Sequence, residues 1–172
     1  MFISLILSTV GSTATAENSS RETPLVRAVA GCSSSVVNLR GRKTVPSEKK
    51  NSSDAAVKQV NGMGTGVVID PRGYILTNYH VVQGVKKIEV TTHDRTKTVG
   101  RLLAHDPVTD LAILKIDIDE PMPVIRTGTS TDLMLAETVA AVGNAYGYEH
   151  TVTVGIISQL GRTVQVLSLI HI

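Results

Sequence analysis

The feature that most limits the fold is a turn signal between two short apolar runs. The run at 67–69 (Val-Val-Ile) leads into Asp-Pro-Arg-Gly at 70–73, and the run at 74–77 (Tyr-Ile-Leu-Thr) follows at once. Proline sets φ near the value that a turn needs, and glycine accepts the positive φ that other residues avoid. The pattern therefore predicts a β-hairpin over 67–77.

Six further short apolar runs extend the strand pattern along the chain. No window of about 11–18 residues shows a persuasive helical period. Aromatic residues are scarce, with one Phe, four Tyr and no Trp, so the core must be built from Val, Ile, Leu and Ala. The β-branched members of that set favour strands, and we expect an all-β barrel or sandwich. The six expected strands are Ser35–Arg40, Ile88–Thr91, Arg101–Ala104, Leu111–Ile116, Thr138–Val142 and Thr151–Ser158.

The first residues resemble a secretion signal. An apolar run at Phe2–Leu7 is followed by small residues and an Ala-x-Ala pattern that ends at Ala16, although no Lys or Arg precedes the run. This order predicts a signal peptide over 1–16, and the alternative is a short buried strand or a frayed terminus. A signal peptide implies a secreted or periplasmic protein.

One main domain is expected after this leader. Residues 17–34 read as a polar extension, and residues 35–172 as a single domain. Within that domain the stretch 41–62 is rich in Lys, Ser and Asn and has little apolar periodicity, which predicts a long exposed loop.

Composition argues against several classes of protein. The net charge is +2, from 17 basic and 15 acidic residues, which is too small to indicate a nucleic-acid partner. No run of about 18 apolar residues exists, so no membrane span is expected. Cys32 is the only cysteine, so an intrachain disulfide is impossible.

Two polar residues lie at the ends of predicted strands, where a fold can present catalytic side chains. His80 follows the strand at 74–77, and Asp110 comes 30 residues later, directly before the apolar run at 111–116. Strand ends leading into turns are where a rigid scaffold presents functional side chains. Taken singly, His80 also fits a structural histidine and Asp110 a turn aspartate, although Asp106 fits the turn role better because a proline follows it.

Five motifs in a fixed order make the pattern specific. Together they resemble the proteases of the HtrA/Deg type, over roughly Val36 to Arg162, with Ala145 in place of that family's usual proline. The stretch 41–62 falls where this family inserts a long variable loop. The motifs are Gly-Thr-Gly-Val-Val at 64–68, Leu-Thr-Asn-Tyr-His-Val at 76–81, Asp-Leu-Ala-Ile-Leu at 110–114, Val-Gly-Asn-Ala-Tyr-Gly at 142–147 and Thr-Val-Gly-Ile-Ile-Ser at 153–158.

The resemblance implies a fold and an activity. The fold would be a chymotrypsin-like double β-barrel, with the first barrel complete and the second truncated. The activity would be that of a quality-control serine endopeptidase that cuts unfolded polypeptides without a cofactor. His80 would be the general base and Asp110 the residue that orients it. Relatives of this kind usually form trimers and carry C-terminal PDZ domains, which extends the same expectation to the full-length parent.

The nucleophile that the resemblance requires is missing from these 172 residues. The family places its serine in Gly-Asn-Ser-Gly-Gly, and no such segment occurs here. Ser158, predicted inside an apolar strand, and Ser168 both lack the flanking glycines, and the tail at 163–172 does not resemble the family. We therefore expect this chain alone to be inactive, with the serine beyond it.

Two alternatives to a protease can be weighed from the sequence. One is a non-catalytic pseudoprotease or chaperone-like binding module on the same fold. The other is a metal site, which would draw on the five histidines of the chain. None of them shows a tight ligand spacing such as H-E-x-x-H, so we expect no metal. These histidines are His80, His93, His105, His150 and His171.

Overall fold

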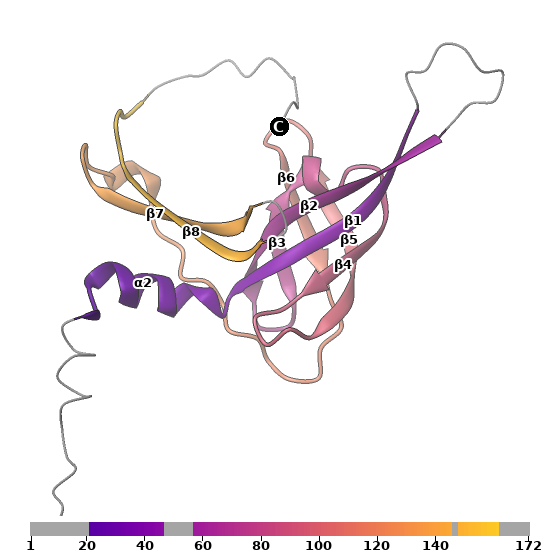
Figure 1. Ribbon diagram of the computed structural model, residues 1–172, viewed down its shortest axis with the longest axis horizontal. Helices are drawn as coiled ribbons and strands as arrows, with labels where there is room; N and C mark the ends of the chain where they lie inside the picture. Colours follow the sequence, from indigo (N-terminus) through magenta and orange to yellow (C-terminus); the bar gives the residue numbers. More distant parts are fainter. Residues whose placement is uncertain (1–20, 47–56, 146–147, 162–172) are drawn as a thin grey trace, which may run out of the picture.

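Six antiparallel strands form a closed barrel, and two more form a separate hairpin (Figure 1). The computed structural model describes residues 21–46, 57–145 and 148–161. The order around the barrel is β1-β2-β3-β6-β5-β4, and β7 pairs only with β8. The barrel strands are β1 (Val36–Pro46), β2 (Val57–Asp70), β3 (Tyr74–Asn78), β4 (Val85–Thr91), β5 (Lys97–Asp106) and β6 (Leu111–Lys115), and the hairpin strands are β7 (Thr138–Ala145) and β8 (Tyr148–Ile156).

The all-β prediction is confirmed, as is a complete first barrel, and among the described residues a second sheet of two strands follows it. The barrel closes because β1 pairs with β2 along one edge and with β4 along the other. Alternate side chains of each strand point inward, so the interior is aliphatic, as expected from the shortage of aromatic residues. The buried core consists of Val37, Leu39, Val68, Ile75, Val82, Ile88, Val90, Ala112, Leu114 and Ile116.

The hairpin predicted over 67–77 is present, and its turn forms for the expected reasons. The N–H of Gly73 donates to the carbonyl of Asp70 at 3.1 Å, and Gly73 has a φ of 88°. A β-carbon at Gly73 would lie 2.7 Å from the carbonyl oxygen of Ile116, so glycine is required both by backbone angle and by space.

The loop predicted over 41–62 is wrong at both ends. Strand β1 continues to Pro46 and β2 begins at Val57, and the two stay paired from Gly41–Gly62 outward to Pro46–Val57. An antiparallel ladder is held by backbone hydrogen bonds, so polar residues can continue a strand beyond the apolar core. Only residues 47–56 of this stretch lie outside the described residues.

Two short helices are present although no window of about 11–18 residues shows a helical period. Helix α2 (Pro24–Ser33) lies within the predicted polar extension, and one turn, α3 (Tyr79–Val82), follows β3. The hydroxyl of Thr23 accepts a hydrogen bond from the N–H of Val26 at 3.3 Å, and a proline occupies the first helical position. Cap and proline together are a helix-start signal, but ten residues are too few for a periodicity window.

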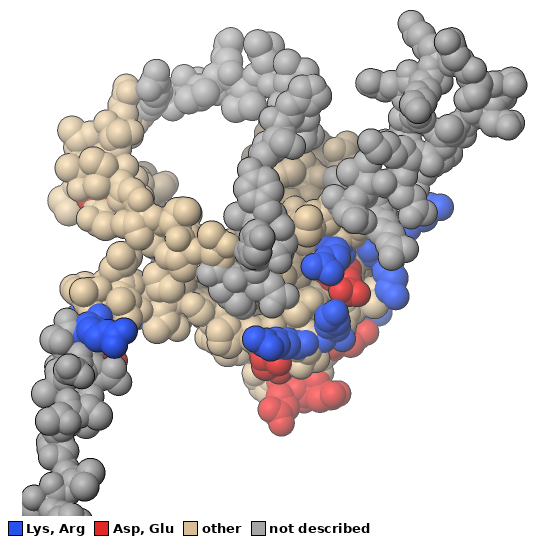
Figure 2. Space-filling model, in the orientation of Figure 1, with Lys and Arg blue, Asp and Glu red and all other residues tan. Residues whose placement is uncertain are grey.

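The β7–β8 hairpin carries little charge and exposes apolar side chains. Val152, Val154 and Ile156 on β8 are 40%, 55% and 60% exposed. Figure 2 shows the hairpin side almost without acidic or basic residues, whereas Lys and Arg mix with Asp and Glu over the barrel. Strand β7 approaches β2 so closely that a β-carbon on Gly143 would lie 3.0 Å from the hydroxyl of Thr65.

The described helices include none that is both long and apolar enough to cross a membrane. The predicted signal peptide at 1–16 and the tail at 163–172 lie outside the described residues.

Leucine truncation tests the barrel core. Leu114 is fully buried, so Leu114→Ala removes contacts and leaves a cavity, and we expect it to lower the free energy of unfolding by about 2–5 kcal/mol. Leu103 is 54% exposed, and Leu103→Ala should change it by less than about 0.5 kcal/mol. Urea denaturation of both variants measures the difference, and equal losses would contradict the assignment of the core.

Candidate active site

The pairing of β3 with β6 brings His80 and Asp110 together. Strand β3 ends at Asn78, and His80 lies in the single turn of α3 that follows. Asp110 is the last residue of the turn before β6, and Leu111, the first residue of β6, pairs with Asn78. Two residues 30 positions apart therefore meet at one end of the barrel.

Both oxygens of the Asp110 carboxylate are bound to His80. The ring nitrogen Nδ1 of His80 lies 2.6 Å from Oδ2, and the backbone N–H of the same histidine donates to Oδ1 at 2.8 Å. The two side chains are 50% and 42% exposed, so the pair lies at the rim of the barrel. Asp110 is thus half-buried, as a carboxylate paired with a histidine can be.

The backbone at Asp110 is unusual and is held by hydrogen bonds. Its φ of 55° lies in the left-handed region, which aspartate tolerates better than most residues other than glycine. The backbone N–H of Tyr79 donates to the carbonyl of Asp110 at 2.9 Å, across the β3–β6 boundary. The conformation turns the carboxylate toward His80 instead of along its own strand.

These hydrogen bonds set the protonation of the pair. The backbone N–H of His80, and after it the ring, lower the pKa of the Asp110 carboxyl below its ordinary value, so the carboxylate is ionised at neutral pH. An ionised carboxylate can only accept, so Nδ1 of His80 carries a proton. In the neutral imidazole the other nitrogen, Nε2, is then the one able to take up a proton.

Sequence reasoning gave no role to two neighbours of this pair. The side-chain amide of Asn78 donates to Oδ2 of Asp110 at 3.2 Å. The ring of Tyr79 stacks on that of His105 on β5, with centroids 4.5 Å apart and an angle of 10° between the planes. The signal for Asn78 was present, because it lies two residues before His80 on the strand that carries the motif.

Of the other residues considered from the sequence, His105 lies next to the pair, against the ring of Tyr79. Ser158 is exposed and lies two residues beyond the end of β8, so its predicted place inside a strand is wrong. His93 lies in the turn between β4 and β5, whereas Ser168 and His171 lie outside the described residues. Over the described ranges, no three His, Cys, Asp or Glu side chains are grouped closely enough to hold a metal ion.

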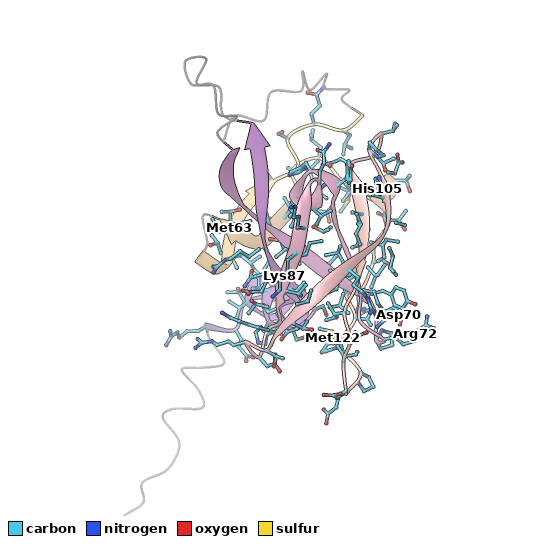
Figure 3. All side chains as sticks on the ribbon, turned by 90° about the vertical axis from the view of Figure 1, so that its right-hand side faces the viewer. Met63, Asp70, Arg72, Lys87, His105 and Met122 are labelled. Atoms are coloured by element: carbon cyan, nitrogen blue, oxygen red, sulfur yellow. The ribbon has the colours of Figure 1, made fainter. Side chains whose placement is uncertain are left out.

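A second charged group occupies the opposite end of the barrel. Arg72 binds the Asp70 carboxylate through Nε and a terminal nitrogen at 2.9 and 2.8 Å, and it lowers the pKa of Asp70 to about 2. The guanidinium carbon also lies 5.2 Å from the centre of the Tyr74 ring. Figure 3 shows Asp70 and Arg72 at the turn, well separated from His105 near the candidate site. This group fastens the hairpin turn.

The sequence of this chain matches a family model and several named proteins. Residues 64–170 match the model of the family described as "Trypsin-like peptidase domain". Over 105 residues, or 60% of this chain, it is 44% identical to a Rickettsia conorii protein named "Probable periplasmic serine endoprotease DegP-like". The chain spans about a fifth of the length of the curated relatives that it matches, 21% in this case.

Solved structures of similar proteins share the fold. A variant of the HtrA-type protease AlgW, solved with a decapeptide, is 32% identical and gives a TM-score of 0.75 over 82% of this chain and 46% of that one. AlgW solved with a tripeptide is 33% identical, with a TM-score of 0.69 over 82% of this chain and 42% of the other.

The lowered pKa of Asp110 predicts a pH-dependent contribution to stability. A carboxylate whose folded pKa is below the ordinary 3.8 stabilises the fold above about pH 4, and this contribution is lost as the pH falls through the folded pKa. We expect the free energy of unfolding of the wild type to fall relative to that of Asp110→Asn as the pH drops below 3.8. Urea unfolding of both proteins across this range measures it, and parallel pH curves would contradict it.

Proposed function

The chain belongs to the trypsin-like peptidase family, in its HtrA/Deg branch, and from this we propose that it is the amino-terminal part of a serine endopeptidase. The substrates would be unfolded polypeptides. The observation that carries the proposal is the 2.6 Å contact between Nδ1 of His80 and the ionised Asp110. This contact leaves Nε2 as the basic nitrogen of the ring.

In this proposal His80 moves the proton during acylation of the serine, and it does the same for the water that later hydrolyses the acyl-enzyme. A serine hydroxyl is a weak nucleophile at neutral pH, and Nε2 of His80 takes its proton as the oxygen attacks the peptide carbonyl. The resulting imidazolium then gives the proton to the leaving amine. Asp110 keeps Nδ1 protonated and stabilises the positive charge that the ring acquires.

The serine itself would come from a part of the parent protein outside these 172 residues. No Gly-Asn-Ser-Gly-Gly segment is present in the chain, and the backbone around that serine would also supply the oxyanion hole. A periplasmic or secreted location is supported by the apolar run and Ala-x-Ala pattern of 1–16 and by the word "periplasmic" in the name of the Rickettsia relative. Trimer formation and C-terminal PDZ domains remain proposals for the parent.

A non-catalytic binding module is the second candidate. The exposed apolar side of β8 formed by Val152, Val154 and Ile156 favours it. Such a module would hold unfolded chains without cutting them. The two candidates differ in whether function requires the histidine.

Casein cleavage by the protein encoded in the complete open reading frame separates these candidates. We expect cleavage, and we expect His80→Ala to reduce it by at least about a thousandfold, because the serine then lacks its base. His93→Ala is the matched control, since this exposed histidine lies in the β4–β5 turn, and it should leave the rate unchanged. Cleavage that survives His80→Ala would exclude the protease mechanism, and absence of cleavage combined with intact binding of unfolded casein would favour the binding module.

A further inference from the structure

Asn78 occupies the N-cap position of a helix without capping it. Helix α3 begins at Tyr79, and Asn78 precedes it in extended conformation, with φ of −77° and ψ of 140°. Asparagine is favoured at this position because its side-chain oxygen accepts from an N–H of the first turn. Here the side chain makes no such hydrogen bond. The usual reason for an asparagine at a helix start therefore does not apply.

The side-chain amide instead crosses to Asp110. Its nitrogen Nδ2 lies 3.2 Å from the carbonyl oxygen of Asp110 and 3.2 Å from the carboxylate oxygen Oδ2. An amide nitrogen carries two hydrogens, so both bonds can be made together. The carboxylate oxygen is the same one that binds Nδ1 of His80, and the carbonyl is the same one that accepts from the N–H of Tyr79.

Packing alone cannot fix the direction of the Asp110 carboxylate. The side chain is 42% exposed and projects from a backbone with positive φ. A half-exposed carboxylate keeps its orientation through hydrogen bonds, since few neighbours restrict its rotation. Among the described residues, the donors to the two carboxylate oxygens belong to His80 and Asn78. Among these donors, Asn78 is thus the residue other than the proton-transferring His80.

We propose that Asn78 is a positioning residue, whose amide holds the Asp110 carboxylate so that Oδ2 faces Nδ1 of His80. This inference rests on the proposed function, because it matters only if His80 transfers protons. The competing explanation is purely structural. In that case Asn78 ties β3 to the β5–β6 turn through the Asp110 carbonyl and has no effect on the carboxylate.

The test measures the histidine–aspartate pair directly, in the 172-residue chain. Hydrogen exchange of the Nδ1 proton of His80, followed by NMR, reports how often the hydrogen bond opens. Titration of the carboxyl carbon of Asp110 reports its pKa. The variants are Asn78→Ala, which removes the amide, and Asn78→Asp, which keeps the shape but places a second carboxylate beside Asp110. Gln83→Ala is the matched control, because it removes an exposed amide just beyond α3.

The expected results form an ordered series. Asn78→Ala should speed exchange of the Nδ1 proton about fivefold, the factor that corresponds to one ordinary hydrogen bond. It should also raise the pKa of Asp110, because the amide is one of the groups that lower it, after the larger effects of His80. Asn78→Asp should raise that pKa further, since two neighbouring carboxylates disfavour each other's charge. Gln83→Ala should match the wild type in both measurements.

Each contrary result identifies what has failed. A protected Nδ1 proton with unchanged exchange and unchanged Asp110 pKa in folded Asn78→Ala would overturn the positioning role and leave the proposed function standing. If the alanine variant does not fold, the same null result in Asn78→Asp overturns the role. A wild-type Nδ1 proton that is already unprotected would show that the pair does not form in solution, which would overturn the proposed function and this inference together.

Discussion

The antiparallel pairing of β3 with β6 is the interaction on which the site depends. It places Asn78 opposite Leu111, so the residue that follows one strand and the residue that precedes the other share one end of the barrel. The order β1-β2-β3-β6-β5-β4 makes this pairing possible, because β3 and β6 are neighbours although two strands separate them in the chain. Any shift in their register would separate His80 from Asp110.

At this end of the barrel, hydrogen bonds hold the functional side chains in place, whereas burial holds side chains in place elsewhere in the molecule. The barrel interior is aliphatic and fully enclosed, whereas the histidine and the aspartate are about half exposed. A carboxylate in such a place is stabilised by donors, here the backbone and ring of His80 and the amide of Asn78. The rim location leaves the His80 ring accessible to a reacting group. The hydrogen-bond donors fix the orientation of the Asp110 carboxylate, which packing does not fix at an exposed site.

The sequence was sufficient for the features that depend on local chemistry. The turn at 70–73 was predictable because proline and glycine have strict backbone preferences, and the strands with apolar cores were predictable from their β-branched residues. The histidine–aspartate pair followed from the resemblance, not from either residue alone. The outer parts of β1 and β2, over 41–46 and 57–62, were not predicted as strands because their backbone pairing does not require apolar side chains. Helix α2 was missed because its signal lies in Thr23 and Pro24, at its start, and not in a repeat.

The contiguity of the barrel has a consequence for the order in which the protein is built. All six strands, together with His80 and Asp110, lie between Val36 and Lys115, and the buried core ends at Ile116, so the barrel can close before the residues after Ile116 have emerged from the ribosome. His80 and Asp110 of the proposed site would then be in place while the rest of the protein is still being synthesised. In the proposed protease, a serine supplied by a later part of the parent protein would then meet a histidine and an aspartate that are already in place.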